Sequence, residues 1–340
     1  MTIGVAVVGL GMAHKPHIQS LRELGDRARI VACYSPTAAR RQSFGKLHPD
    51  LPVTGDLDAV LADPGVDAVV LLTPPMAHRD LVLQCAAAGK HVLLEKPLDY
   101  TSERARESVD AMAKADRRFA VMLQHRFRDA SLKLISIVKS GELGALISAS
   151  ASIRWWRTPE YFNEPGRGMK ARDGGGVLIT QAIHTLDLFQ SLTGPIAQVM
   201  AMARTSPQRK IDTEDIVAAA VRFQNGAIGT IDATTVAYPG FPEKIELACE
   251  NGTAVLEAET LAVHYRDGRV LRHDGGESKS GGADPMAFPH GAHKALTADF
   301  LDAIEQRREP VVSGREALKI HLLIEALLQS AERGQAVSLA

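Results

Sequence analysis

Three polar side chains share one side of an otherwise apolar predicted helix. In the segment 174–189, which reads GGGVLITQAIHTLDLF, Thr180, His184 and Asp187 fall at positions i, i+4 and i+7. This spacing places them on one helix face. An imidazole can transfer a proton near neutral pH, and a neighbouring hydroxyl or carboxylate can orient it. The segment is therefore a candidate catalytic site built around His184, and its three leading glycines would let another group approach the backbone closely.

A lysine at the end of a predicted strand is the second candidate. The segment 88–98, AGKHVLLEKPL, ends in Glu95, Lys96 and Pro97. Pro97 lacks a backbone N–H and biases Lys96 away from helix, which holds the lysine in an extended corner. Beside a cationic nicotinamide, a partly desolvated lysine would release its proton more readily, which suits proton exchange with an alcohol. A single lysine after a strand is more often a surface charge, so this interpretation depends on a cofactor site upstream.

Such a cofactor site is indicated near the N-terminus. The sequence VAVVGLGMAH places Gly9 and Gly11 directly after the first predicted strand and before a helix. The first glycine allows a tight turn, and the second lets a pyrophosphate approach the helix N-terminus. His14 stands where the fingerprint has its third glycine, so a plain glycine turn is the alternative for this motif alone. The strands and helices that follow favour dinucleotide binding.

The end of the second predicted strand bears on which dinucleotide is bound. NAD enzymes usually have an acidic residue there, which binds the ribose hydroxyls. This chain instead has Ser35, followed by Arg40 and Arg41, in CYSPTAARR. No carboxylate is present to repel a 2′-phosphate, and the guanidinium groups could bind it. The alternative is that both arginines are solvated helix charges. We predict NADP(H), with NAD(H) as the second choice.

The first part of the chain alternates between short apolar strands and amphipathic helices. This alternation is typical of a parallel sheet covered on both faces. We therefore predict an α/β fold whose residues 1–123 form a Rossmann domain with a doubly wound parallel sheet. The predicted strands are 3–8, 30–34, 66–72, 91–94 and 119–123, and the predicted helices are 15–24, 56–62, 76–88 and 102–115.

After about residue 145 long strand-like stretches dominate, separated by turn signals such as QNG and ENG. We predict that residues 124–340 form an α+β domain with a large, mostly antiparallel open sheet, and that 273–285 is a flexible loop by composition. The predicted strands are 146–156, 196–205, 215–223, 227–236, 244–249 and 262–265, and the predicted helices are 177–192, 291–306 and 314–332.

The bulk composition excludes several classes of partner. The 340 residues carry a formal net charge of −1, which argues against nucleic acid or an anionic membrane as the main partner. The three cysteines, Cys33, Cys85 and Cys249, are odd in number and widely spaced, which argues against disulfides and a zinc site and suits a reducing compartment. No uncharged apolar run could span a bilayer, and the apolar start fits a strand better than a signal peptide. We predict a cytoplasmic protein.

Four motifs together resemble the glucose–fructose oxidoreductase/inositol dehydrogenase (Gfo/Idh/MocA) family. They occur in the expected order and at the expected spacing: GLG after the first strand, TPPMAH at 73–78, AGKHVLLEKPL and GGGVLITQAIHTLDL. The resemblance extends through 300–331. It implies a Rossmann domain followed by a substrate domain with an open sheet, which commonly forms a homodimer or homotetramer interface. Members oxidise or reduce a hydroxyl of a sugar, cyclitol or related compound with NAD(H) or NADP(H).

The resemblance also implies roles for individual residues. Lys96 would transfer the proton, His184 would lie near the reacting hydroxyl, and the Lys96–Pro97 bond would be cis. The glycines 174–176 would let their helix approach the nicotinamide. The predicted cofactor-binding residues are Gly9, Gly11, Met12, Ala13, Ser35, Arg40, Thr73, Pro74, His78, Glu95, Lys96 and Gln124.

Thr180 departs from the family pattern, because many dehydrogenases of the family have an aspartate four residues before the histidine. A threonine hydroxyl cannot act as a base at neutral pH, so Thr180 would only orient while Lys96 and His184 move the proton. This departure leaves two alternatives open. One is a non-redox protein that binds or senses a dinucleotide, and the other is a relative that uses tightly bound NAD(P) for transient oxidation.

The remaining candidates have weaker signals. Arg157, Tyr161 and Arg167 could bind the hydroxyls or an anionic group of a small polyol or sugar. The tryptophans 155 and 156 and Tyr161 could equally be core or interface aromatics. Residues 124–126 follow the predicted strand 119–123 at its carboxyl end and could contact nicotinamide or substrate.

Two late histidines, His290 and His293, have no cysteine or acidic residue nearby in metal-ligand spacing. We interpret them as loop or helix-cap residues, and we predict no metal, since the chemistry does not require one. Asp187 would either orient the His184 imidazole or bind backbone.

Overall fold

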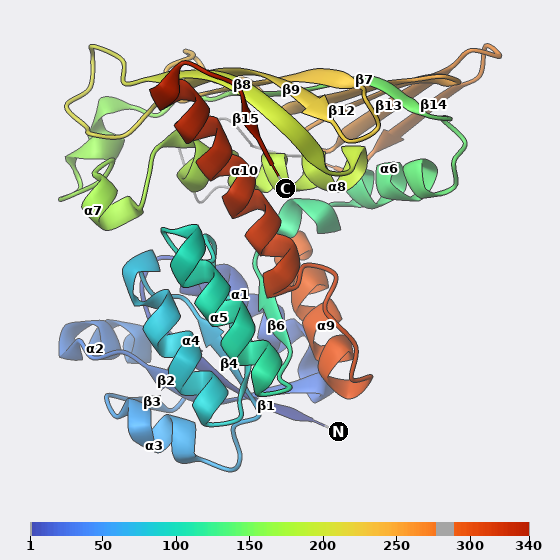
Figure 1. The fold of residues 1–340 in the computed structure, drawn as a ribbon. Helices are drawn as coiled ribbons and strands as arrows, with labels where there is room; N and C mark the ends of the chain where they lie inside the picture. Colours follow the sequence, from blue (N-terminus) through green and yellow to red (C-terminus); the bar gives the residue numbers. More distant parts are fainter. Residues whose placement is uncertain (1, 277–288, 340) are drawn as a thin grey trace. The chain divides into compact units, whose positions relative to one another are not determined.

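The computed structural model describes residues 2–276 and 289–339 (Figure 1). The chain divides into two units. Unit 1 contains Met1–Leu123 and His290–Leu318, and unit 2 contains Gln124–Pro289 and Lys319–Ala340. Unit 1 thus takes in a late segment, because helix α9 (Gly291–Glu305) packs against helix α1 (His14–Glu23). A single domain boundary after residue 123 does not include this late segment in unit 1.

Unit 1 is built on a six-stranded sheet in the order β3-β2-β1-β4-β5-β6, and every neighbouring pair is parallel. This confirms the predicted doubly wound sheet. All six residues of β1 are buried, as expected for a strand covered on both faces. The strands are β1 Ile3–Val8, β2 Ala28–Tyr34, β3 Val53–Thr54, β4 Ala68–Leu71, β5 His91–Leu94 and β6 Phe119–Val121.

The helices of unit 1 begin where the sequence supplies caps. The Asp56 carboxylate accepts the Ala59 N–H at the start of α3, and the Thr101 hydroxyl accepts the Arg104 N–H at the start of α5. Helix α2 was not predicted, because only Phe44 of its ten residues is buried and no apolar stripe marks it. The remaining helices are α2 Ala38–Leu47, α3 Leu57–Ala62, α4 His78–Ala87 and α5 Ser102–Lys114, with short 3₁₀ turns at Gly25–Arg27 and Pro75–Ala77.

Unit 2 contains a nine-stranded sheet in the order β14-β13-β12-β11-β7-β10-β9-β8-β15. Neighbouring strands are antiparallel except β7 and β10, which are parallel, so the predicted mostly antiparallel open sheet is confirmed. The strands are β7 Leu146–Arg154, β8 Ile196–Arg204, β9 Ile216–Phe223, β10 Ile228–Thr234, β11 Lys244–Cys249, β12 Gly252–Glu257, β13 Thr260–Tyr265, β14 Val270–Asp274 and β15 Val337–Ser338.

Helices α6 and α8 lie on the same side of this sheet (Figure 1). The other side carries exposed apolar side chains, among them Met202 and Ile228. The helical segments are η3 Gln124–Phe127, α6 Asp129–Lys139, η4 Pro159–Asn163, α7 Lys170–Asp173, η5 Leu178–Ala182 and α8 Ile183–Thr193, while α10 Gly314–Arg333 begins in unit 1 and ends in unit 2.

Three differences from the predicted elements matter for function. The helix expected over 177–192 is a π-helix over Leu178–Ala182 followed by the α-helix α8. Strands β12, β14 and β15 were not predicted. Most of the expected loop at 273–285 lies outside the described residues, and Asp274 still belongs to β14. Across the described part of the chain, no helix combines the length and apolar character needed to cross a bilayer.

Candidate active site

The turn after β1 has the geometry of a phosphate-binding loop. Gly9 has φ +106°, and a Cβ atom there would lie 2.7 Å from the carbonyl carbon of Leu72, so only glycine lets β1 end against the end of β4. A Cβ atom at Gly11 would meet nothing within 4 Å, which leaves open space in front of α1. Ala13 stands at the N-cap of α1, and Met12 is exposed. These residues fit a pyrophosphate at the helix N-terminus.

The residues after β2 form a small polar corner. Ser35 is buried, and its Oγ accepts the Thr37 N–H at 3.3 Å. The Arg41 guanidinium donates to the carbonyl oxygens of Ser35 and Pro36, at 2.8 and 3.0 Å. Arg40 is exposed in the first turn of α2. Arg41 therefore binds backbone at the strand end, and Arg40 is the arginine of this pair whose side chain faces solvent.

His78 connects two of the predicted site segments. Its imidazole is fully buried, with Nδ1 2.8 Å from the Pro97 oxygen and Nε2 2.8 Å from the Thr73 oxygen. Burial lowers the pKa of His78, and the two backbone oxygens oppose this shift only in part. The bond between Lys96 and Pro97 is cis, as the resemblance implied. His78 thus positions the Thr73 turn and the Lys96 corner through their backbones.

Two side-chain oxygens of the predicted site have no hydrogen-bond partner among the described residues. They are Thr73 Oγ1, after β4, and Gln124 Oε1, in η3. Buried polar atoms are rarely left unsatisfied, so each is suited to a hydrogen bond with a ligand. Pro74, beside Thr73, is exposed.

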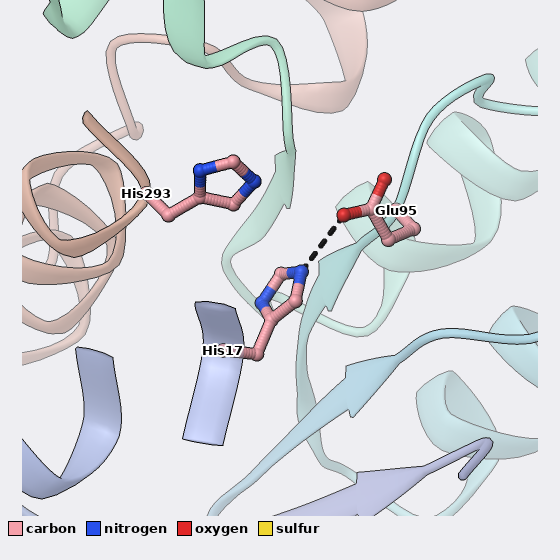
Figure 2. A group of neighbouring side chains, drawn as sticks. All are labelled: His17, Glu95 and His293. Atoms are coloured by element: carbon pink, nitrogen blue, oxygen red, sulfur yellow. Dashed lines mark hydrogen bonds and ion pairs between the residues drawn. The ribbon is translucent and has the colours of Figure 1, made fainter. Parts of the chain in front are cut away.

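Glu95 has two imidazoles as neighbours (Figure 2). Its Oε1 lies 2.8 Å from His17 Nε2, and its Oε2 accepts the backbone N–H of Lys96 at 3.0 Å. Burial by itself raises the pKa of Glu95, but the hydrogen bond from His17 and the charges of His17, His293 and Lys96 outweigh it and lower the pKa to about 2. The Glu95 carboxylate is therefore ionised at neutral pH.

The interpretation of His293 as a loop or cap residue is wrong. His293 lies in the first turn of α9, is 2% exposed, and its ring centroid lies 5.5 Å from that of His17. Sequence spacing could not reveal this, because His17, Glu95 and His293 come from three distant segments. His290 does stand at the N-cap of α9, where its imidazole contacts Glu23.

In unit 2, the predicted polar face is interrupted by the π-helix. A π turn has more residues per turn than an α-helix, so the α-helical spacing between Thr180 and His184 does not hold across Leu178–Ala182. His184 and Asp187 both lie in α8 and keep their i, i+3 relation. The Thr180 hydroxyl contacts the Gly176 oxygen at 2.6 Å and Gln181 Oε1. Single π turns are frequent at functional sites.

Two residues of η3 pack against α8. The His125 and His184 rings are stacked with centroids 5.0 Å apart, and both side chains are buried. Arg126, one residue after His125, donates to both oxygens of Asp187, which lies three residues after His184. Arg126 is thus a partner of Asp187 that the helical spacing, which suggested His184 or backbone, did not indicate.

One of the glycines before the π-helix, Gly176, lies directly against the backbone of another residue of unit 2, Glu214. A Cβ atom at Gly176 would lie 1.8 Å from the backbone oxygen of Glu214. The Glu214 carboxylate accepts the N–H groups of Gly176 and Leu178, each at 3.1 Å, and so caps the helix start. Burial raises the pKa of Glu214. The close approach at Gly176 is thus made by Glu214.

Unit 2 also has a narrow pocket, with room inside it for about one water molecule. Tyr161, Arg167, Thr180 and Glu214 are among its lining residues. The Arg167 guanidinium lies 5.1 Å from the centre of the Tyr161 ring. The pocket therefore brings together two of the predicted substrate residues, Tyr161 and Arg167, with Thr180.

Arg157 and His184 are not among the lining residues of this pocket. Arg157 is buried, with its guanidinium carbon 5.0 Å from the Trp155 ring centre and 5.8 Å from that of Tyr161. Trp155 is also buried, in agreement with the core alternative for this aromatic. Arg157 thus supports the aromatic wall behind the pocket.

Comparison with known proteins identifies the class. Residues 3–123 match the family model described as oxidoreductase family, NAD-binding Rossmann fold, and residues 131–255 match that of the GFO/IDH/MocA C-terminal domain. The chain belongs to the GFO/IDH/MocA family and is an oxidoreductase with an NAD-binding Rossmann domain. The predicted family and enzyme class are confirmed.

Relatives extend over nearly the whole chain. D-apiose dehydrogenase of Paraburkholderia graminis is 26% identical, over 98% of this chain and 89% of its own length. Myo-inositol 2-dehydrogenase of Thermotoga maritima is 25% identical, over 98% of each. The WlbA dehydrogenase of Bordetella pertussis, solved with NADH and UDP-GlcNAcA, is 28% identical with a TM-score of 0.84, covering 100% of this chain and 99% of its own.

Proposed function

We propose that this chain transfers hydride between NADP(H) and a hydroxyl-bearing carbon of a sugar, cyclitol or sugar derivative. The observation that carries the proposal lies within one sheet. The Gly9 turn follows β1, the Thr73 turn follows β4, and the Glu95-Lys96-Pro97 corner follows β5, and these three strands are neighbours. Ligands of open α/β sheets bind at the carboxyl ends of the strands where the order reverses. Relatives named as apiose and inositol dehydrogenases support the substrate class.

The proposed chemistry divides between cofactor and protein. The nicotinamide, when bound, accepts or supplies the hydride. Lys96 takes the hydroxyl proton during oxidation, and His184 assists it. Thr180 orients, because its hydroxyl is engaged with the Gly176 oxygen or Gln181 and cannot act as a base. Tyr161 and Arg167 bind substrate in the unit 2 pocket, and Arg157 stands behind them.

The preference for NADP(H) rests on the corner after β2. Ser35 brings no negative charge there, and Arg40 is exposed in the first turn of α2. A guanidinium group can form charge-assisted hydrogen bonds with a 2′-phosphate. The WlbA dehydrogenase was solved with NADH, so this preference distinguishes the chain from that relative.

Lys96→Ala tests the central assignment. Turnover should fall by roughly 10²–10⁴-fold, the usual contribution of a positioned proton-transfer group, while the Kd of the dinucleotide changes little. Lys114→Ala, which removes an exposed lysine on α5, is the matched control and should keep wild-type turnover. A screen of sugars and cyclitols, read by the absorbance of reduced nicotinamide, supplies the substrate. Wild-type turnover in the Lys96 variant would disprove the assignment.

The neutral Thr180 favours one second candidate, a non-redox protein that binds or senses a dinucleotide. That protein would bind the cofactor tightly and stay silent in the substrate screen. A third outcome is stoichiometric NAD(P) retained through purification, which indicates transient oxidation by a resident cofactor. We also propose a cytoplasmic location, where Cys33, Cys85 and Cys249 would stay reduced. All three are free thiols.

A further inference from the structure

Three side chains with metal-binding atoms converge in unit 1 (Figure 2). His17 comes from α1, Glu95 follows β5, and His293 comes from α9. One ligand atom of each side chain lies within 4.8 Å of the other two. Among the described residues, this is the group of three such side chains with the spacing needed to hold a metal ion. We propose that His17, Glu95 and His293 bind a divalent transition-metal ion of the zinc class. Two imidazoles and one carboxylate form a ligand set that zinc uses when a further position stays open.

The surroundings suit a bound ion. The side chains of His17 and His293 are almost completely buried, whereas that of Glu95 is 15% exposed, which gives the cluster one side open to solvent. The second oxygen of Glu95 accepts the Lys96 backbone N–H, so the carboxylate is held in place from outside the cluster. The two rings stand at 90° to each other, and in Figure 2 they and the carboxylate border one common space.

Metal binding requires a modest rearrangement of the cluster, in which one contact widens and the longer separations, of up to 4.8 Å between ligand atoms, shorten. Ligand atoms bonded to a tetrahedral zinc ion at about 2.0–2.1 Å lie about 3.3 Å apart. His17 Nε2 and Glu95 Oε1 are 2.8 Å apart, the distance of a hydrogen bond. An ion would replace the shared proton and widen this contact by about half an ångström, which side-chain rotation can supply. Water would take the open position.

A bound ion would add a coordinate link between three elements that packing and the His17–Glu95 hydrogen bond now connect. It would link α9, from the late part of the chain, to α1 and to the end of β5. Because the ion binds the folded protein, it would raise the thermal stability of the protein with increasing metal concentration. It would also immobilise Glu95, whose carboxylate holds the backbone of Lys96.

The test uses the full chain without a polyhistidine tag, treated with chelator and then titrated with Co²⁺, whose visible absorption reports coordination. We expect one equivalent to bind with the spectrum of a four- or five-coordinate site, Zn²⁺ to displace it, and the Tm to rise with metal concentration. His293→Gln and Glu95→Gln should each weaken binding by roughly 100-fold or more. Circular dichroism verifies that both variants fold.

His290→Gln is the matched control. It makes the same substitution beside the same helix, at an exposed imidazole that also contacts a carboxylate, Glu23. It should leave the Co²⁺ spectrum and affinity unchanged. A wild-type chain that takes up no Co²⁺ or Zn²⁺ at millimolar concentration, or one whose binding survives both cluster variants, overturns the proposal and leaves a hydrogen-bonded imidazole–carboxylate network. These measurements use neither nucleotide nor substrate, so their outcome is independent of the proposed oxidoreductase reaction.

Discussion

Asp187 and Arg126 form a bidentate ion pair, with the two carboxylate oxygens 2.6 and 2.7 Å from the guanidinium nitrogens. The Asp187 side chain is 1% exposed and that of Arg126 10%. The pair links η3 to α8. Arg126 follows His125 by one residue in η3, and Asp187 follows His184 by three residues in α8. The imidazoles of His125 and His184 stack. The pair therefore determines where α8 presents His184.

Breaking this pair should strongly destabilise the protein. Arg126→Met and Asp187→Asn each leave a buried group without its partner, which costs about 3–5 kcal/mol of unfolding free energy. The double variant should lose less than the sum of the two. Denaturant titration measures these values. Arg154→Met, in the exposed pair with Asp232, is the control and should cost about 1 kcal/mol or less. A loss that small in both buried variants would contradict the structural role.

Thr180 should matter much less for turnover than Lys96. Thr180→Val keeps the shape of the side chain and removes the hydroxyl. Because this hydroxyl only orients, kcat should fall by about 10-fold at most, since a net hydrogen bond contributes about 1 kcal/mol. Steady-state kinetics of both variants with the substrate from the screen decide the matter. A loss in Thr180→Val as large as that in Lys96→Ala would give Thr180 an essential role.

The cofactor preference should follow the residues after β2. Ser35→Asp combined with Arg40→Ala adds a carboxylate for the ribose hydroxyls and removes a ligand of the 2′-phosphate, so kcat/KM should shift toward NAD(H) by roughly 10-fold or more. Arg106→Ala removes an exposed arginine from α5 and should leave the ratio unchanged. The ratio of kcat/KM values for the two cofactors is the measurement. An unchanged ratio in the double variant counts against NADP(H).

Acidification should destabilise unit 1 partly through His91. Its Nδ1 accepts the Arg118 backbone N–H at 2.8 Å, so the folded state requires the neutral ring. Burial, with the charges of Arg117 and Arg118, lowers its pKa from 6.5 to about 4. The unfolded chain therefore takes up this proton first as the pH falls. The stabilisation is complete above about pH 6.5 and is lost progressively toward pH 4, by about 1–2 kcal/mol after allowance for solvent screening.

The measurement is the unfolding free energy of wild type and His91→Asn across this pH range. The variant should show a flatter pH profile, because it lacks the titrating ring. His264→Asn, at an exposed position of β13, should keep the wild-type slope. Equal slopes in wild type and His91→Asn would remove His91 from the pH response.

The uncovered face of the nine-stranded sheet should mediate self-association. Met202, Ile228 and Met200 are 77%, 61% and 43% exposed there, and exposed apolar side chains that gather on one face mark interaction surfaces. We expect a homodimer or homotetramer, and Met202→Glu should weaken its association by about 10-fold or more in sedimentation equilibrium. Leu132→Glu changes an equally apolar exposed residue on α6, on the covered side, and should not alter the assembly. A wild-type monomer would refute the expected interface.

Local patterns were sufficient for the elements of unit 1 that carry the cofactor turn. The short apolar runs and the helical apolar patterns of residues 1–123 determine the alternation of strands and helices, and alternation of this kind permits few arrangements other than a parallel sheet. Gly9 follows from local conformation as well, because the turn after β1 takes φ +106° and tolerates no Cβ atom.

The contacts of the candidate site were decided by the tertiary structure, because they join residues far apart in the chain. The partner of Asp187 lies 61 residues away, and Glu95 meets His17 from 78 residues away. No local spacing encodes such pairs. The start of the π-helix at Leu178–Ala182 is likewise bound by a distant residue, Glu214, which follows it by more than 30 residues. The Glu214 carboxylate and backbone oxygen accept N–H groups of this turn. Sequence thus determined which residue types are available, and long-range packing determined which of them meet.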